Sequence, residues 1–188
     1  AMGGTADDMA GMHQIHSSDV IKITTATSEK PKADAMVTTA EGIILSVLSA
    51  DCQPVLFADK VAGVIGAAHA GWQGVSHGIL ENTIDEMVAL GALRKNIVAV
   101  IGPSISQKVY EVGPEFAEKF LKEDSFSVRY FTQGFGDRLH FNLPAFGLDR
   151  LWASGIKEAV WTQHCTYSDP ARFFSYRRSV HEKQDDYG

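Results

Sequence analysis

The stretch that most constrains the fold is SADCQPVLFADKVAGVIGAAHAGWQG, residues 49–74, because its hydrophobic period changes near its end. Residues 55–58 and 61–68 are continuous apolar runs rich in β-forming side chains, which predicts two strands. From Val75 to Val88 the apolar residues recur at helical spacing, and Gly91 is suited to cap the end of that helix. A strand that passes almost directly into a helix indicates a mixed α/β (α+β) fold.

Further elements follow from the same kinds of pattern. Strands are predicted at residues 43–48, 97–101 and 158–162, and helices at residues 114–121 and 143–154. Residues 122–138 lack a clean period, which is typical of a loop or a short hairpin. The unbroken apolarity of the strands predicts a sheet that is covered on both faces. Because 188 residues fit one domain, we expect residues 1–188 to form a single α/β domain.

The net charge and the lack of a long apolar run argue against several classes of protein. A formal net charge of −6 argues against a partner such as nucleic acid or an anionic membrane. No apolar run approaches the roughly 20 residues of a membrane span, and the start AMGGTADDMAG lacks the basic and apolar regions of a secretory signal. We therefore expect a cytoplasmic monomer or weak homodimer. Ala1 and Met2 are typical of a cloning remnant, and we expect residues 1–12 to be partly tag and flexible.

Cys52 and His69 are polar side chains inside the most apolar part of the chain. A thiolate and neutral imidazoles are good ligands for a borderline-soft divalent ion, and three protein ligands leave one tetrahedral position open, as in catalytic zinc sites. The third ligand would be His16 or His13, and spacing does not choose between them. The only two cysteines, Cys52 and Cys165, fit reduced thiols, although one bridge between them stays open.

Two other interpretations of these residues need no metal. Cys52 could be a catalytic nucleophile whose pKa is lowered by His69, with Asp51 orienting the pair. Alternatively, Cys52 is a small buried hydrophobe, His69 a hydrogen-bonded core residue and Asp51 a turn residue. Spacing alone favours the structural interpretation.

The segment FFSYRRS, residues 173–179, places two arginines beside aromatic rings. Arg177 and Arg178 could bind phosphate, and the rings could stack on a base. The alternative is an edge strand with solvated arginines and buried aromatic side chains.

Six segments together resemble one family. They are QIHSSDV, ADAMVTT, SADCQPVLFAD, GAAHAGWQG, AVIGPSISQKVYEVGPE and CTYSDPARFFSYRRS, and they cover most of the chain from Gln14 to Ser179. They are similar to the YfiH-type proteins, long labelled multicopper polyphenol oxidoreductases or laccase-domain proteins and now regarded as purine nucleoside phosphorylases with adenosine deaminase activity. The resemblance implies one domain in which two mixed sheets pack face to face between helices.

The resemblance also implies a metal site and an activity. The family's zinc ligands correspond to His16, Cys52 and His69, so the resemblance selects His16 over His13 and favours one Zn²⁺ over copper. We expect the catalytic residues to be Cys52 and His69 of this site together with the neighbouring Asp51, a candidate general acid or base. The implied reactions are the phosphorolysis of adenosine, inosine and methylthioadenosine to the free base and the ribose 1-phosphate, and the deamination of adenosine. The partners would be purine nucleosides and phosphate.

One residue of this chain departs from the family's sequence pattern, and its histidines do not fit the family's multicopper label. Gln73 stands where HAGWRG usually has arginine, so a substrate-binding role at this position would lack the positive charge. A multicopper oxidase holds its coppers largely with His-x-His pairs, whereas this chain has seven histidines and no such pair. A copper polyphenol oxidase is therefore not expected. The remaining alternatives are a cysteine hydrolase or deamidase that uses Cys52 and His69, and a catalytically weakened metal-binding module.

Overall fold

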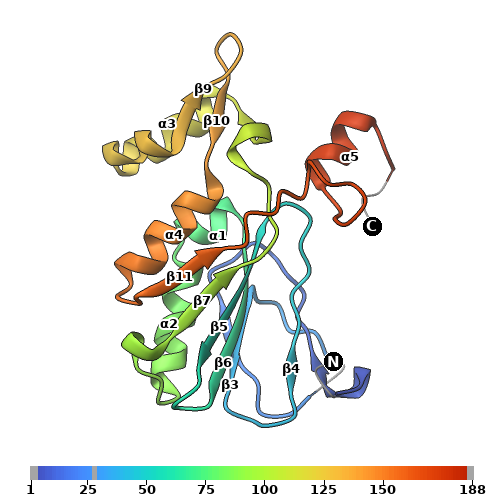
Figure 1. The fold of residues 1–188 in the computed structure, drawn as a ribbon, viewed down its shortest axis with the longest axis vertical. Helices are drawn as coiled ribbons and strands as arrows, with labels where there is room; N and C mark the ends of the chain where they lie inside the picture. The colour runs from blue at the N-terminus through green and yellow to red at the C-terminus, as the bar shows by residue number, and fades with distance from the viewer. Residues whose placement is uncertain (1–3, 27–28, 186–188) are drawn as a thin grey trace.

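The structure, a computed structural model, describes residues 4–26 and 29–185. Ala1 and Met2, the expected cloning remnant, lie outside these residues. The largest sheet contains β2 (Val20–Lys22), β3 (Ala35–Thr38), β5 (Gln53–Asp59), β6 (Val64–Ala70), β7 (Val98–Ile101) and β11 (Glu158–Trp161). The six strands follow the order β11-β7-β5-β6-β3-β2 (Figure 1). The sheet is mixed, because β2 pairs with β3 and β7 with β11 in parallel, while the other neighbours are antiparallel.

A tight hairpin joins β5 and β6 at the centre of this sheet. The Oδ1 atom of Asp59 accepts hydrogen bonds from the main-chain nitrogens of Val61 and Ala62, at 2.9 and 3.0 Å, and Gly63 has a φ of +68°. Because residues 61–63 form this turn, β6 begins at Val64, three residues after the predicted start of the strand at residue 61. The pairing sets Gln53 opposite Ala70 and therefore brings the segments around Cys52 and His69 together.

Three helices cover one face of the sheet: α1 (Trp72–Ser76), α2 (Ile79–Ala89) and α4 (Leu143–Ala153) (Figure 1). α2 buries Ile79, Leu80, Ile84 and Met87 completely against the strands. The single helix expected here is two helices, because Gly78 has a left-handed φ of +89° that interrupts the helical backbone. Gly91 follows the end of α2 with a φ of +103°, which confirms its predicted role as a cap.

The opposite face of the sheet is only partly covered. The small parallel sheet of β1 (Met9–Ala10) and β4 (Ile44–Leu45) lies over the β2–β3 side. It shares a second core with that side, formed by Ala10, Met12, Ile23, Ala33 and Met36.

Farther along the same face, over β5, β6, β7 and β11, apolar side chains are open to solvent. Leu56 is 56% and Val160 57% exposed, and Ile65 and Val98 are also exposed. The prediction that both faces of the sheet are covered is therefore wrong here, because no described element packs on these strands on that side. The apolar runs predicted the positions of these strands, but they did not predict which face of the sheet is covered.

A third sheet sits above the end of the main sheet with α3 (Pro114–Glu123) (Figure 1). Its strands are β8 (Glu111–Val112), β9 (Phe131–Gln133) and β10 (Leu139–Phe141), in the order β8-β10-β9. β9 and β10 form a hairpin. Its first strand lies in residues 122–138, where a loop or a short hairpin is predicted, and its second strand begins just after them. A 3-10 helix, η4 (Ser125–Tyr130), precedes it. Phe116 and Phe120 of α3 pack on Trp72, which ties this upper layer to α1.

The C-terminal segment crosses to the far side of the molecule and ends in α5 (Tyr176–Glu182) (Figure 1). The edge strand considered for residues 173–179 is therefore wrong. The Oγ atom of Ser175 accepts a hydrogen bond from the main-chain nitrogen of Arg178 at 3.1 Å, which caps the helix. The aromatic side chains of Phe174 and Tyr176 are exposed rather than buried.

Three further 3-10 helices complete the described elements, namely η1 (Ala6–Asp8), η2 (Arg94–Asn96) and η3 (Gln107–Val109). The mixed α/β class predicted from the sequence is confirmed, with sheets of six, three and two strands where the family resemblance implies two. Among residues 4–26 and 29–185, no helix has the length and apolar composition needed to cross a bilayer.

Candidate metal centre and pocket

A pocket of about 900 Å³ opens where the upper layer, α1 and the C-terminal segment meet the end of the main sheet. Its wall combines polar groups with aromatic rings: Trp72, Tyr110, Phe174 and Tyr176 line it together with Arg177. A cavity of this size with a few convergent polar groups is suited to a small organic ligand.

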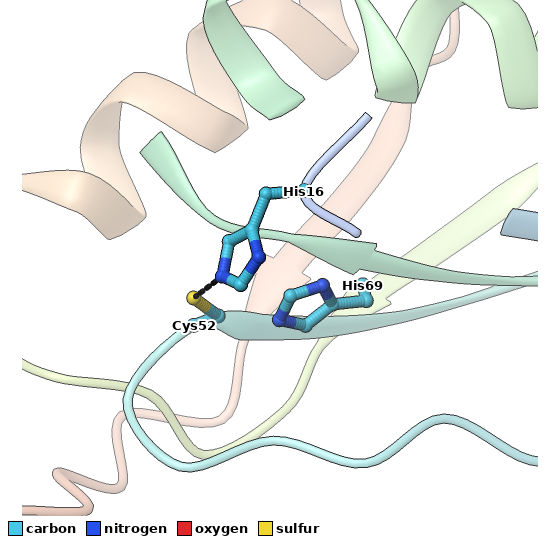
Figure 2. A group of neighbouring side chains, drawn as sticks. All are labelled: His16, Cys52 and His69. Carbon is cyan, nitrogen blue, oxygen red and sulfur yellow. Dashed lines mark hydrogen bonds between the residues drawn. The ribbon is translucent and has the colours of Figure 1, made fainter. Parts of the chain in front are cut away.

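His16, Cys52 and His69 converge on this pocket, and they are its main chemical feature (Figure 2). Their ligand atoms all lie within 4.8 Å of one another. The Sγ atom of Cys52 is 3.9 Å from the Nε2 atom of His16, and the two imidazole rings are perpendicular with centroids 4.9 Å apart. Sequence reasoning alone left His13 and His16 open, and the structure brings His16 into the cluster.

Three separate parts of the chain supply these side chains. His69 comes from β6, Cys52 directly precedes β5, and His16 lies in the loop between β1 and β2 with a φ of +58°. The loop before Cys52 is closed by Ser49, whose Oγ atom donates a hydrogen bond to the carbonyl of Cys52. Burial falls from His69 to Cys52 to His16, so the cluster opens toward solvent on the His16 side.

The donor set and its spacing fit a tetrahedral metal. Zinc bonds of about 2.0–2.1 Å to nitrogen and about 2.3 Å to sulfur place two ligand atoms about 3.3–3.6 Å apart. The ligand atoms of the cluster, all within 4.8 Å of one another, would draw closer together around a bound ion. Gly71 keeps the space open: a Cβ atom there would lie 2.8 Å from Cys52 Sγ and 3.2 Å from His16 Cδ2. Two imidazoles and one thiol with ligand atoms this close together can hold a metal and leave one tetrahedral position for another ligand.

The protonation of the cluster also suits metal binding. Burial lowers the pKa of His69 and so favours the neutral imidazole that a metal requires, although Asp34 opposes this effect. Burial, with the nearby charges of Asp51 and Asp34, raises the pKa of Cys52 to about 12. Without a bound cation, Cys52 therefore stays a thiol at neutral pH, which disfavours it as a free nucleophile. Cys52 and Cys165 are both free, so no bridge joins them.

Asp51 lies beside Cys52 with a left-handed φ of +94°, but its carboxylate points to other partners. Its Oδ1 atom accepts a hydrogen bond from Thr166 Oγ1 at 2.6 Å, and its Oδ2 atom accepts one from the main-chain nitrogen of Arg177 at 2.7 Å. Through these contacts Asp51 holds the C-terminal segment at the pocket, and its catalytic role stays a prediction.

The two arginines have different surroundings. The guanidinium of Arg177 lines the pocket, stacks over the Tyr110 ring at 5.2 Å and donates to the carbonyl of Glu111 at 2.6 Å. Arg178 instead donates to three main-chain carbonyls, those of Thr166, Tyr167 and Phe173, at 2.7–3.0 Å. Gln73 lines the pocket beside Trp72. The structure thus brings Arg177 and Gln73 to the pocket, while Arg178 binds the backbone of its own segment.

Several residues that line the pocket or contact the metal cluster were not singled out from the sequence. Gly71 and Trp72 stood within the HAGWQG segment, and Tyr110 stood beside Glu111 in the YEVG segment, but nothing in their spacing marked their contacts. Burial raises the pKa of Tyr110, so its phenol stays protonated and can donate a hydrogen bond into the pocket. Asp34, which hydrogen-bonds His69, was also missed because it stands 35 residues before its partner.

Comparison with known proteins identifies the family and agrees with this fold. The family model for multi-copper polyphenol oxidoreductase laccase matches residues 1–188. A purine nucleoside phosphorylase of Rickettsia prowazekii is 38% identical over 177 residues, which cover 94% of this chain and 73% of the relative. An adenosine deaminase from an unknown prokaryotic organism is 34% identical, covering 94% of this chain and 72% of the relative.

Among solved structures, the YfiH protein of Bacillus licheniformis superposes with a TM-score of 0.88 at 27% sequence identity, covering 95% of this chain and 72% of that chain. Its fold matches the mixed α/β architecture described above. The chain therefore belongs to the multi-copper polyphenol oxidoreductase laccase family, that of the YfiH-type proteins.

Proposed function

We propose that this protein is a zinc-dependent purine nucleoside enzyme, which cleaves adenosine, inosine and methylthioadenosine by phosphorolysis and also deaminates adenosine. The observation that carries the proposal is the convergence of His16, Cys52 and His69 on one pocket. The names of two relatives, a purine nucleoside phosphorylase and an adenosine deaminase, indicate the substrate class.

The three ligands would hold the ion and leave its fourth position facing the pocket. Zinc in such a site stabilises negative charge and lowers the pKa of a coordinated water to about 7. Zinc fits the donor set better than the copper of the family's description, since the described residues provide a single group of three ligands and the chain has no His-x-His pair. A multicopper oxidase needs several copper sites.

The remaining pocket residues suit a nucleoside and phosphate. Trp72, Phe174 and Tyr176 offer aromatic surface on which a purine could stack. Arg177 has hydrogen-bond donors on a guanidinium that the Tyr110 ring holds in place, and such a group binds phosphate oxygens well. Gln73 would contact substrate by neutral hydrogen bonds only.

Both reactions balance with these participants. In phosphorolysis a phosphate oxygen bonds to C1′ of the ribose, the C1′–N9 bond breaks with its electron pair on the base, and the base takes up a proton. In deamination a water oxygen bonds to C6 of the purine, one proton of the water goes to N1 and the other to the amino group, and the C6–N6 bond breaks as ammonia leaves. Sequence reasoning makes Asp51 the candidate for proton transfer, and Tyr110 is a neutral hydrogen-bond donor in the same pocket.

The test measures zinc content and turnover in the same samples. Wild type, Cys52→Ala and a matched control, Cys165→Ala, are purified, analysed for metals, and given inosine or adenosine in phosphate buffer while released bases are followed by chromatography. Cys165 is a suitable control because it is the other free thiol and does not line the pocket. We expect about one zinc per chain and base release in wild type and Cys165→Ala, and neither in Cys52→Ala.

Other outcomes identify the alternatives. Turnover by zinc-free wild type that stops after thiol alkylation would favour a cysteine hydrolase or deamidase. Bound zinc with no turnover of any nucleoside would favour a weakened metal-binding module. Full turnover by zinc-free Cys52→Ala would contradict the proposal outright.

A further inference from the structure

We propose that Asp34 is a positioning residue that orients two of the three metal ligands at once, His69 through one carboxylate oxygen and His16 through the other. Asp34 directly precedes β3, and its side chain is fully buried. This inference rests on the zinc site proposed above and adds to it the group that sets the direction of the ligands.

The first contact fixes the ring of His69. The Nδ1 atom of His69 lies 2.9 Å from the Oδ1 atom of Asp34. A carboxylate can only accept, so Nδ1 carries the hydrogen, and in the neutral ring this leaves the lone pair on Nε2. Figure 2 shows the other ring nitrogen of His69 on the side of Cys52, where a metal would be held. Asp34 thus selects the tautomer that can ligate, as carboxylates do behind other metal-binding histidines.

The second contact holds the loop that carries His16. The Oδ2 atom of Asp34 accepts hydrogen bonds from the main-chain nitrogens of Ile15 and Ser17, at 3.1 and 2.6 Å, and from Ser17 Oγ at 2.8 Å. These donors flank His16, whose φ of +58° lies in the left-handed region that side chains other than glycine seldom adopt. The carboxylate therefore holds the loop in the conformation that directs the His16 ring toward Cys52.

A backbone contact adds to these side-chain contacts. The main-chain carbonyl of Asp34 also accepts a hydrogen bond from the main-chain nitrogen of His69 at 2.7 Å. Backbone and side chain of one residue thus hold the strand and the ring of His69 together.

A buried aspartate can equally serve stability alone, and Asp59 offers the matched control. Asp59 is also buried and its carboxylate accepts hydrogen bonds from the main-chain nitrogens of Val61, Ala62 and Leu93. It stands at the other end of the β5–β6 hairpin, away from the cluster. Asp34→Asn and Asp59→Asn make the same change of one oxygen to an amide group.

The experiment measures zinc affinity by competition with a chelator for wild type, Asp34→Asn and Asp59→Asn. An asparagine at position 34 cannot accept from all the donors on both sides, because one of its terminal atoms is itself a donor. We expect the zinc affinity of Asp34→Asn to fall about 10- to 100-fold, the range typical for loss of such a partner, and that of Asp59→Asn to stay within about twofold of wild type. Equal affinities for wild type and Asp34→Asn would overturn the inference and leave the zinc site intact.

A second measurement needs no variant to fold. In metal-free wild type, nitrogen-15 NMR of the histidine rings at slightly alkaline pH reports which nitrogen of His69 carries hydrogen. Hydrogen on Nδ1 supports the inference, and hydrogen on Nε2 overturns it. If wild type binds no zinc at the cluster, the proposed zinc enzyme fails, and the ligand-orienting role fails with it.

Discussion

The main-chain nitrogen of Arg177 donates a hydrogen bond of 2.7 Å to the Oδ2 atom of Asp51. Asp51, which directly precedes Cys52, thus anchors the first turn of α5. Thr166 donates to the other carboxylate oxygen. One side chain therefore links the floor of the pocket to two points of the C-terminal segment, including the arginine that we expect to bind phosphate.

Asp51→Asn tests this link. Asparagine tolerates the left-handed backbone, but it cannot accept hydrogen bonds at both terminal atoms, so the bond to Arg177 or to Thr166 is lost. We expect the free energy of unfolding to fall by about 1.5–3 kcal/mol, the usual contribution of a hydrogen bond to a charged group, with zinc content unchanged. Chemical denaturation measures the change, and Asp137→Asn at a highly exposed site is the control. An unfolding free energy equal to that of wild type would contradict the link.

Gly71→Ala tests whether the space between the ligands matters. The added methyl group would press on Cys52 Sγ and His16 Cδ2, so one ligand must move. We expect zinc affinity to fall at least about 10-fold, comparable to the loss of a supporting contact at a metal site. In the control Gly11→Ala, the nearest atom to the new Cβ is Lys30 Cε at 3.9 Å, and affinity should not change. Zinc binding by Gly71→Ala as tight as that of wild type would show that the metal site does not depend on the space beside Gly71.

Arg177 and Arg178 should differ when each is replaced by alanine. We expect Arg177→Ala to raise KM for phosphate about 10-fold, because a charge-assisted hydrogen bond is lost in the pocket. Arg178→Ala should instead lower the free energy of unfolding by about 1.5–3 kcal/mol, since three carbonyls lose a charged donor. Steady-state kinetics and denaturation on both variants measure the two effects. A larger rise in KM for Arg178→Ala than for Arg177→Ala would reverse the assignment.

Neighbouring residues of β5 face opposite sides of the sheet and should respond differently. Phe57 is 2% exposed and packs in the main core, so Phe57→Ala should cost about 3–5 kcal/mol of unfolding free energy. Leu56 lies on the uncovered face, and Leu56→Thr should change stability by no more than about 0.5 kcal/mol. Thermal or chemical unfolding distinguishes the two. A large loss for Leu56→Thr would mean that this face is packed in solution.

Local patterns predicted the elements well where one face of a regular element is buried. The helix at α4 and the strands at β7 and β11 fall within one or two residues of their predicted bounds, because apolar side chains recur on their core side. Pro114 begins α3 as predicted, since a proline needs no hydrogen-bond partner for its nitrogen in the first helical turn.

The errors have identifiable physical causes. Gly78 broke one predicted helix into two through its backbone conformation, which apolar spacing does not report. The residues of α5 looked like an edge strand because aromatic residues favour strands, but the Ser175 cap and the backbone contacts of Arg178 favour a helix. Leu56 is as apolar as its buried neighbours, so its exposure depends on what packs above the sheet.

The metal ligands were within reach of sequence reasoning, but their supporting groups were not. Cys52 and His69 were conspicuous as polar residues among apolar ones, whereas the choice of His16 over His13 came from the family resemblance. Asp34 looks like any aspartate before a strand until the pairing of β3 with β6 brings it beside His69. Such contacts arise from the sheet order, which spacing along the chain does not determine.

The most direct test of the central claim is X-ray absorption at the zinc edge on the purified wild-type protein loaded with one equivalent of zinc. We predict one sulfur at about 2.3 Å and two imidazole nitrogens at about 2.0–2.1 Å, with a fourth light ligand, whereas Cys52→Ala should retain no zinc. A zinc surrounded only by nitrogen and oxygen in wild type would contradict the site formed by His16, Cys52 and His69.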